Sequence, residues 1–132
     1  MHRKLVFDAG FLALGFGGDP RVKQYFDEVA EERAAGYVSG PNLAEFYYKT
    51  CRKLGKQTAD AWYFRALESG LAVAEGDYLD RLAGQEKCKD GIGLSLADCY
   101  ALALAKSEGA LLLTTDSGLA EAVDVEVKHI SA

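Results

Sequence analysis

The chain has 132 residues, a hydrophobic fraction of 49% and a formal net charge of −5. This length and composition predict one globular domain with a substantial core, since two ordinary domains need a longer chain. The acidic balance excludes a protein that coats duplex nucleic acid through bulk positive charge. No apolar run reaches the ~20 residues that cross a bilayer, and Asp8 interrupts the apolar stretch near the N-terminus, so we expect a cytoplasmic protein without a membrane segment. The three cysteines form no C-x-x-C pair, which excludes the common zinc and disulfide frameworks.

Short apolar runs alternate with helical patterns along the chain, and glycine-rich turns separate them. Asp19 with Pro20, Thr58 and Ser95 are typical of helix starts. In chain order, the sequence predicts a strand over 4–7, a glycine-rich loop over 15–20, a helix over 20–35 that stops at Gly36, and a strand over 37–39. A helix that opens at 40–42 and stops near Gly55 follows, then a helix over 58–68 and a strand over 71–74. The last part of the chain is predicted to form helices over 77–88 and 95–107, a strand over 111–115 and an edge strand over 125–127. Strands that alternate with helices through short loops predict an α/β domain with a mainly parallel sheet.

Four acidic residues fall where an α/β fold gathers side chains, at the carboxyl ends of its parallel strands. Asp8 ends the strand over 4–7, and Asp116 follows the run LLLTT in the stretch GALLLTTDSGL. Glu45 and Asp98 are expected in the first turns of helices that follow a strand or a loop. We therefore expect the four carboxylates to converge at one edge of the sheet.

Each acid also has a purely structural interpretation. Asn42 with Glu45, and Ser95 with Asp98, have the spacing of a capping box, and Asp116 can cap the turn that follows its strand. The helix that carries Asp98 is apolar on almost every side, which predicts a buried helix and a carboxylate that needs a partner. For each acid taken alone, the sequence leaves both interpretations open.

Taken together, the four acids favour a metal site. Carboxylates that pack together repel one another, which raises their pKa values unless a cation compensates. Oxygen ligands without a nearby histidine suit Mg²⁺ or Mn²⁺, and His2 and His129 lie near the chain ends, outside the set. Such ions activate a water and stabilise the leaving oxygen in phosphodiester cleavage.

Three stretches, in order, carry a resemblance to a known family: LVFDAGFLAL, GPNLAEFYYKTCRKLG and GLSLADCYALALAKSEGALLLTTDSGL. They resemble the PIN domain family and, within it, the small VapC-like toxins, over most of the chain. The resemblance implies a single PIN-like domain over 1–132, folded as a three-layer α/β/α sandwich with a mainly parallel central sheet and an acidic pocket at its carboxyl edge. By position, it implies that Asp8, Glu45, Asp98 and Asp116 hold Mg²⁺ or Mn²⁺, directly or through water. It also implies that Thr114 orients Asp116 or a metal-bound water.

The chain departs from the family at one point. Many members have Ser or Thr soon after the first aspartate, whereas this chain has Ala9 and Gly10. The hydroxyl contact that such residues make is therefore absent from this stretch, although the acid is present. Because all four acids are present, the resemblance implies an active metal-dependent endoribonuclease, the toxin of a toxin–antitoxin pair.

The resemblance also implies partners: an RNA substrate, a cognate antitoxin and a second copy of the chain in a homodimer. Lys49, Arg52, Lys53 and Lys56 follow Glu45 and offer a track for the RNA backbone, or else a solvated helix face. Other functions stay open at this point. They are a housekeeping RNA-processing nuclease of the same fold, a Mg²⁺-dependent phosphoacceptor or phosphatase, and a binding module whose acids receive an arginine-rich partner.

Overall fold

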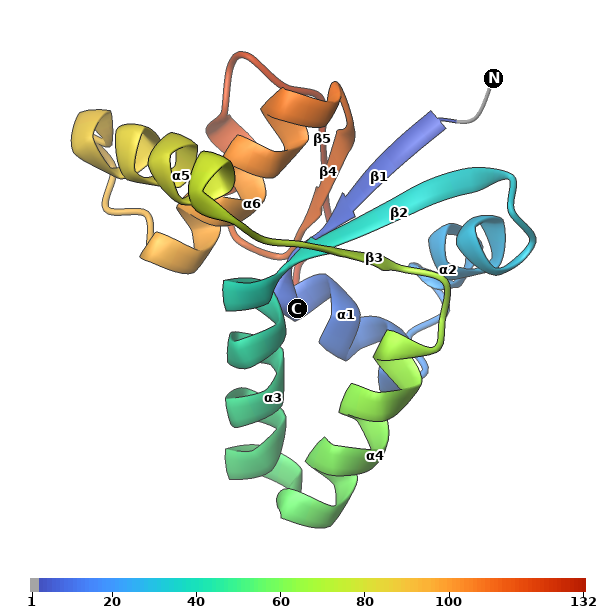
Figure 1. Ribbon diagram of the computed structural model, residues 1–132. Coiled ribbons are helices and arrows are strands. Elements are labelled where there is room, and N and C mark those ends of the chain that lie inside the picture. Colours follow the sequence, from blue (N-terminus) through green and yellow to red (C-terminus); the bar gives the residue numbers. More distant parts are fainter. Residues whose placement is uncertain (1–2) are drawn as a thin grey trace.

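The computed structural model describes residues 3–132, which form a five-stranded parallel sheet and six α-helices (Figure 1). The elements are β1 (Arg3–Phe7), α1 (Ala9–Phe16), α2 (Lys23–Ala30), β2 (Ala34–Ser39), α3 (Gly40–Leu54), α4 (Lys56–Leu67), β3 (Ala72–Ala74), α5 (Asp77–Lys89), α6 (Leu96–Glu108), β4 (Leu111–Thr114), the short 3₁₀ helix η1 (Leu119–Glu121) and β5 (Val127–His129). Within the described residues, no helix has both the length and the apolar character needed to cross a bilayer.

The strand order is β3-β2-β1-β4-β5, with every neighbouring pair parallel. From β1 the chain builds the sheet outward through β2 and β3, and then returns to place β4 and β5 on the other side. The order therefore reverses between β1 and β4, and α/β sheets bind ligands at such a switch point. Phe7 is the register partner of Leu113, so the residues after both strands reach the same edge together.

Helices cover both faces of the sheet, and alternate residues of the strands face the two layers. Leu5 and Phe7 of β1 pack in a core with α1, α2, α3 and α4, whereas Val6 packs in a second core with α5 and α6. Leu113 and Leu112 of β4 divide between the same two cores. This arrangement is a three-layer α/β/α sandwich, which confirms the fold class predicted from the sequence.

Helix α1 is the element that the sequence pattern did not predict. The residues after Asp8 form a helix from Ala9 to Phe16, and the loop begins only at Gly17. The Asp8 side chain caps this helix, since its Oδ1 accepts from the Phe11 N–H at 2.8 Å. The segment AGFLALGF has no polar face and two glycines, so no amphipathic pattern signals a helix, and burial against the sheet determines its structure.

Helix α2 is shorter than predicted, and Gly36 does not end it. The helix ends at Ala30, and Gly36 lies inside β2, where an added Cβ would approach Leu71 Cδ2 to 2.6 Å and Val29 Cγ2 to 2.8 Å. Gly36 is thus a site of close packing between the sheet and α2. Other bounds differ by a few residues: Ser39 is the N-cap of α3, α4 begins at Lys56, and the edge strand β5 begins at Val127.

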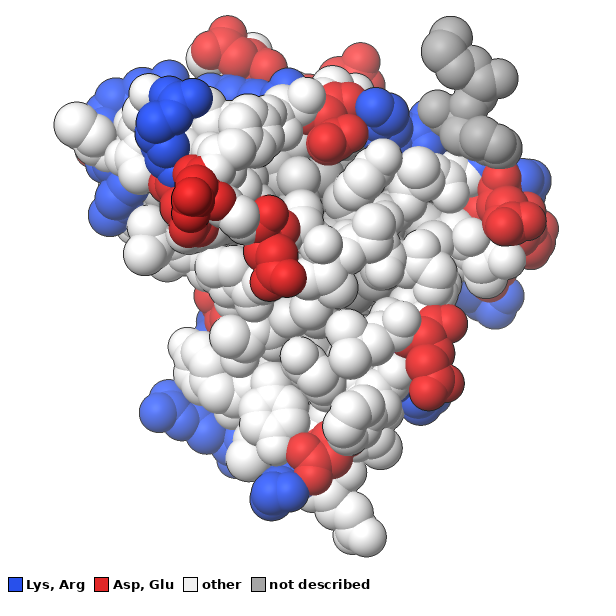
Figure 2. Space-filling view, in the orientation of Figure 1, with Lys and Arg blue, Asp and Glu red and all other residues white. Residues whose placement is uncertain are grey.

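The face of the molecule over the edge strand β3 is mostly uncharged in the space-filling view (Figure 2). Phe64 and Leu67 of α4 and Val73 of β3 expose their side chains to solvent by 60%, 41% and 40%. An exposed apolar area of this kind beside an edge strand is typical of an association surface.

Candidate active site at the carboxyl edge of the sheet

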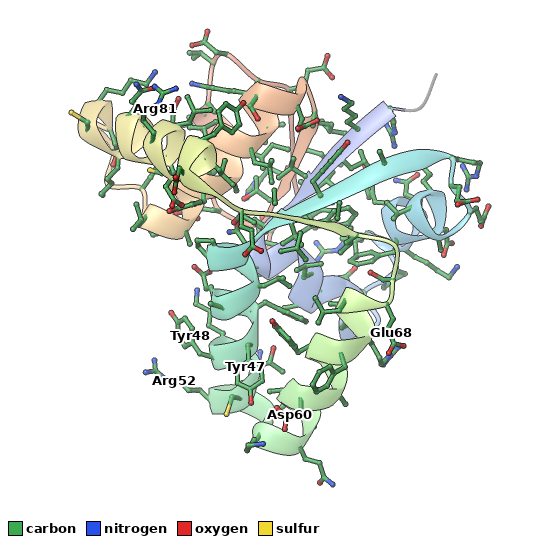
Figure 3. All side chains as sticks on the ribbon, viewed as in Figure 1. Tyr47, Tyr48, Arg52, Asp60, Glu68 and Arg81 are labelled. Carbon is green, nitrogen blue, oxygen red and sulfur yellow. The ribbon has the colours of Figure 1, made fainter. Side chains whose placement is uncertain are left out.

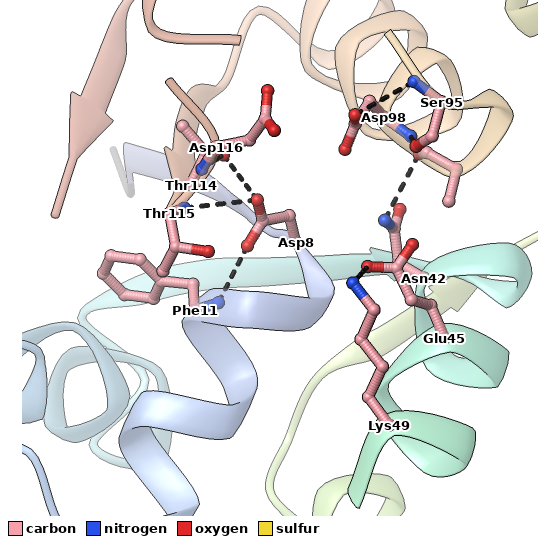
Figure 4. A network of polar contacts seen from close by, with 11 residues as sticks. Asp8, Phe11, Asn42, Glu45, Lys49, Ser95, Asp98, Thr114, Thr115 and Asp116 are labelled. Carbon is pink, nitrogen blue, oxygen red and sulfur yellow. Dashed lines mark hydrogen bonds and ion pairs between the residues drawn. The ribbon is translucent and has the colours of Figure 1, made fainter. Parts of the chain in front are cut away.

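Asp8 lies at the centre of the acidic edge, directly after β1, and is only 4% exposed. Its Oδ1 accepts from the Phe11 N–H, and its Oδ2 accepts from the Thr114 hydroxyl and from the Thr115 N–H at 3.3 Å (Figure 4). Burial raises the pKa of Asp8 from 3.8 to about 6, although these hydrogen bonds oppose the shift and the charge of Asp98 adds to it. The fold therefore buries a carboxylate that three hydrogen-bond donors hold in place.

Thr114 connects the first acid to the last. Its hydroxyl donates to Asp8 Oδ2 and accepts from the Asp116 N–H at 2.9 Å. The Asp116 carboxylate is partly exposed, and its Oδ2 accepts from the Leu119 N–H at 2.8 Å. Asp116 therefore caps the turn after β4, as one of the two interpretations predicted. His129 of β5 is the register partner of Thr114, so the sheet also brings this histidine close to that edge.

Asp98 reaches the same edge from α6 and forms the predicted capping box. Its Oδ2 accepts from the Ser95 N–H at 3.1 Å, while its own N–H donates to the Ser95 hydroxyl at 3.0 Å. Burial raises the pKa of Asp98, and the nearby charges of Asp116 and Glu45 add to the effect against the Ser95 hydrogen bonds. One carboxylate thus stabilises the helix start and faces two other acids.

Glu45 lies in the second turn of α3, one turn later than predicted, because the helix begins at Gly40. The proposed capping box with Asn42 is absent here, since Ser39 is the N-cap. Glu45 instead pairs with Lys49, with Nζ and Oε2 3.1 Å apart. Burial lowers the pKa of Lys49, but the hydrogen bond and charge of Glu45 outweigh it and hold the pKa above its ordinary value.

Asn42 is a site residue that the sequence interpretation treated only as a cap. It is 1% exposed, its N–H donates to Ser39 Oγ, and its Nδ2 donates to the Ala97 carbonyl at 3.2 Å. This last bond ties α3 to the first turn of α6, beside Asp98 (Figure 4). The sequence did contain a signal that Asn42 is more than a cap. The residue falls on the apolar stripe of α3, one turn before Phe46, where a buried polar side chain needs a hydrogen-bond partner.

The carboxylates of Asp8, Glu45, Asp98 and Asp116 surround one space between β1, α3, α6 and β4 (Figure 4). Within residues 3–132, no three Asp, Glu, His or Cys side chains stand close enough together to enclose a metal ion. The chemistry of the donors nevertheless fits Mg²⁺ or Mn²⁺, because these ions prefer carboxylate oxygens and retain several waters of their own. Burial raises the pKa values of both Asp8 and Asp98, and the charges of neighbouring acids add to it, as expected for carboxylates gathered at one edge of the sheet.

A groove of about 650 Å³ lies beside the acidic edge, between α1, α3 and α4. Its lining includes Ala9, Gly10, Phe46, Lys49, Lys53 and Trp62. The groove is mainly apolar, with the two lysines from α3 as its cationic contribution. It offers an extended molecule a path that ends next to Asp8.

The four cations predicted to contact RNA divide into two sets. Lys49 and Lys53 line the groove, whereas the Arg52 guanidinium lies over the Tyr48 ring, 5.0 Å from its centroid, on an exposed part of α3 (Figure 3). Lys56 pairs with Asp60, with Nζ and Oδ2 2.6 Å apart. The geometry thus favours Lys49 and Lys53 for contacts beside the acids, and RNA binding by all four stays a prediction.

A parallel sheet with buried and partly buried carboxylates at its switch point defines the class of the protein, a small α/β domain with an acidic site at the carboxyl edge. The model of the PIN domain family matches residues 5–125. The chain belongs to the PIN domain family, which confirms the resemblance seen in the sequence. No curated protein matches the sequence.

Solved structures share the fold over nearly their whole length. VapC20 of Mycobacterium tuberculosis, a toxin that cleaves the sarcin–ricin loop, superposes with a TM-score of 0.71 and 23% identity, covering 92% of this chain and 98% of that chain. DNA-bound VapBC from Salmonella typhimurium gives a TM-score of 0.74 at 16% identity, covering 96% and 98%. VapBC2 from Rickettsia felis, bound to a promoter DNA fragment, gives 0.70 at 15% identity, covering 96% and 98%.

Proposed function

We propose that this chain is a single-domain, metal-dependent endoribonuclease and the toxin of a toxin–antitoxin pair. The observation that carries the proposal is the buried Asp8 carboxylate at the switch point, close enough to Asp98 for the two charges to interact. Membership of the PIN domain family and the likeness in fold to VapC20, described as a toxin that cleaves the sarcin–ricin loop, support the same conclusion.

Asp8, Asp98 and Asp116 are the residues that would hold Mg²⁺ or Mn²⁺, with Glu45 acting through water. When bound, the metal supplies an activated water for attack on phosphorus and stabilises the departing oxygen. Thr114 holds the Asp8 carboxylate in place and fixes the Asp116 backbone. Lys49 restrains Glu45, and Asn42 keeps α3 and α6 at their spacing, so two acids stay aligned from different helices.

The burial of Asp8 argues against a phosphoacceptor. An aspartate that attacks phosphorus must reach the phosphorus atom of the substrate itself, whereas Asp8 is only 4% exposed, and a small metal ion needs no such access. A module that binds an arginine-rich partner has no need to bury a carboxylate at this depth. Both alternatives are therefore less consistent with the site than metal-dependent cleavage.

The antitoxin partner is proposed from the neighbours, two of which are described as VapBC complexes. The groove beside the acidic edge is large enough for a peptide segment, and a partner there would reach the catalytic acids. We assign the RNA backbone to the same side, where Lys49 and Lys53 offer cations. The uncharged face with Phe64, Leu67 and Val73 is the proposed homodimer surface.

The test is cleavage of a mixed RNA pool by the purified protein with Mg²⁺, Mn²⁺ or EDTA. We expect cleavage that requires metal and is lost in Asp98→Asn, while the exposed-site control Asp124→Asn cleaves like the wild type. Cleavage in EDTA, or full activity of Asp98→Asn, would contradict the proposal. Growth arrest on expression, relieved by Asp98→Asn, then separates a toxin from a housekeeping nuclease, which causes no arrest.

A further inference from the structure

Thr115 packs against Gly10 across the start of α1. A Cβ added at Gly10 would overlap the Thr115 hydroxyl and lie 3.1 Å from Thr115 Cβ and 3.3 Å from its Cγ2. The Thr115 N–H donates to Asp8 Oδ2 at 3.3 Å, which fixes the residue beside the acid (Figure 4). The hydroxyl of Thr115 therefore occupies the space that a side chain at residue 10 would fill.

This hydroxyl is free. Among residues 3–132 it forms no hydrogen bond, although every buried side-chain nitrogen or oxygen in that part of the chain has a partner. The Thr115 hydroxyl is therefore reached by solvent, in agreement with the partial exposure of the residue. The hydroxyl of its neighbour Thr114 differs, because both of its bonds are made inside the protein, to Asp8 and to the Asp116 N–H.

The position of the free hydroxyl points to the substrate. Gly10 lines the groove and packs against the Thr115 hydroxyl, and Thr115 directly precedes Asp116, so the hydroxyl lies next to a residue of the groove and next to a residue of the acidic edge. A phosphodiester that runs from one to the other passes this point, where Ala9 and Gly10 have no side-chain donor.

We propose that the Thr115 hydroxyl donates a hydrogen bond to a non-bridging phosphate oxygen of the RNA, and that Gly10 is required because it leaves room for this hydroxyl. The inference rests on the proposed nuclease function. It assigns to the residue after β4 a substrate contact that no side chain at the start of α1 can make, since the chain has Ala9 and Gly10 there.

Thr115→Val and Thr115→Ser form a matched pair, because valine keeps the shape and serine keeps the hydroxyl. With Mn²⁺ and a randomised RNA pool carrying a fluorophore and a quencher, initial rates below saturation report kcat/KM. We expect Thr115→Val to lose about tenfold or more, as for a hydrogen bond to a charged group, and Thr115→Ser to stay within about threefold. The melting temperatures of both variants should match that of the wild type within about 2 °C, since neither creates a large cavity.

A second pair moves the hydroxyl. Gly10→Ser alone should lower the melting temperature by about 5 °C, because the new side chain collides with Thr115. Gly10→Ser combined with Thr115→Ala should recover both the melting temperature and most of the cleavage, because the new Cβ takes the space that the Thr115 hydroxyl leaves and carries a hydroxyl one bond away. These melting temperatures test the packing without reference to activity.

Two outcomes would overturn the inference. Thr115→Val with the cleavage rate of the wild type excludes a contact from the hydroxyl, and equal losses in Thr115→Val and Thr115→Ser with lowered melting temperatures reduce Thr115 to a packing role. A wild-type protein that cleaves no RNA with Mn²⁺ refutes the nuclease proposal itself and the Thr115 contact with it. That failure is recognised because it appears before any variant is compared.

Discussion

Asp8→Asn is expected to remove a large pH dependence from the stability of the metal-free protein. The pKa of Asp8 rises from 3.8 to about 6 on folding, chiefly through burial. A difference of about two pKa units corresponds to about 3 kcal/mol at 1.36 kcal/mol per unit. This is a large part of the net stability of a small domain.

The direction follows from proton binding. Between pH 3.8 and about 6 the folded state holds a proton on Asp8 that the unfolded chain has released. The contribution of Asp8 to the free energy of unfolding is therefore largest in acid, and the wild type loses stability relative to Asp8→Asn as the pH rises through this window. Above this window, the wild type has lost about 3 kcal/mol of its free energy of unfolding relative to Asp8→Asn.

Urea unfolding in EDTA, from about pH 3 to about pH 8, measures this difference directly. The comparison requires that the free energy of unfolding falls with urea concentration at the same slope in both proteins. Asp124→Asn serves as the control and should follow the wild-type curve, because its side chain is exposed. Curves for the wild type and Asp8→Asn that run parallel across the whole range would refute the reasoning. They would show that Asp8 titrates in the folded protein at its ordinary pKa.

Three further results are expected. Mn²⁺ should raise the melting temperature of the wild type near about pH 7 and leave that of Asp8→Asn almost unchanged. Thermal unfolding monitored by fluorescence measures both temperatures, and equal shifts would mean that the ion binds elsewhere. Asn42→Ala should lower the free energy of unfolding by about 2 kcal/mol in urea, since it removes the buried side-chain hydrogen bonds that Asn42 accepts from the Ser39 hydroxyl and donates to the Ala97 carbonyl, and a loss below about 0.5 kcal/mol would contradict that role. Thr114→Val removes a hydrogen bond that lowers the pKa of Asp8, so the acidic limb of the pH–rate profile for metal-dependent cleavage should move to higher pH, and an unmoved limb would show that Asp8 does not govern it.

The sequence pattern was sufficient where local chemistry and burial agree. Ser95 and Asp98 form the predicted capping box, and Gly109 ends α6 in a left-handed conformation with φ of 63°. The apolar run Leu111–Thr114 is the predicted buried strand, and it lies at the centre of the sheet beside β1. The positions of Asp8 and Asp116 at one edge then follow from parallel pairing alone.

The pattern was insufficient where distant parts of the chain determine the structure. The segment after Asp8 forms α1 only because the sheet and α2 bury it on several sides. Glycine is typical of a helix stop, which is why the sequence predicts one at Gly36. Val29 and Leu71 leave no room for a side chain there, so this glycine lies inside β2 instead. The link from Asn42 to Ala97 spans 55 positions, a contact that no local spacing can signal.

The hydrogen bond between Thr114 and Asp8 joins residues that are 106 positions apart. Closing so long a loop costs entropy, and the bond can form only once β4 has docked against β1. Until then the Asp8 carboxylate lacks both the hydroxyl that holds Oδ2 and the neighbouring Asp116. A chain cut ahead of β4 accordingly lacks Thr114 and Asp116, and with them one side of the acidic edge.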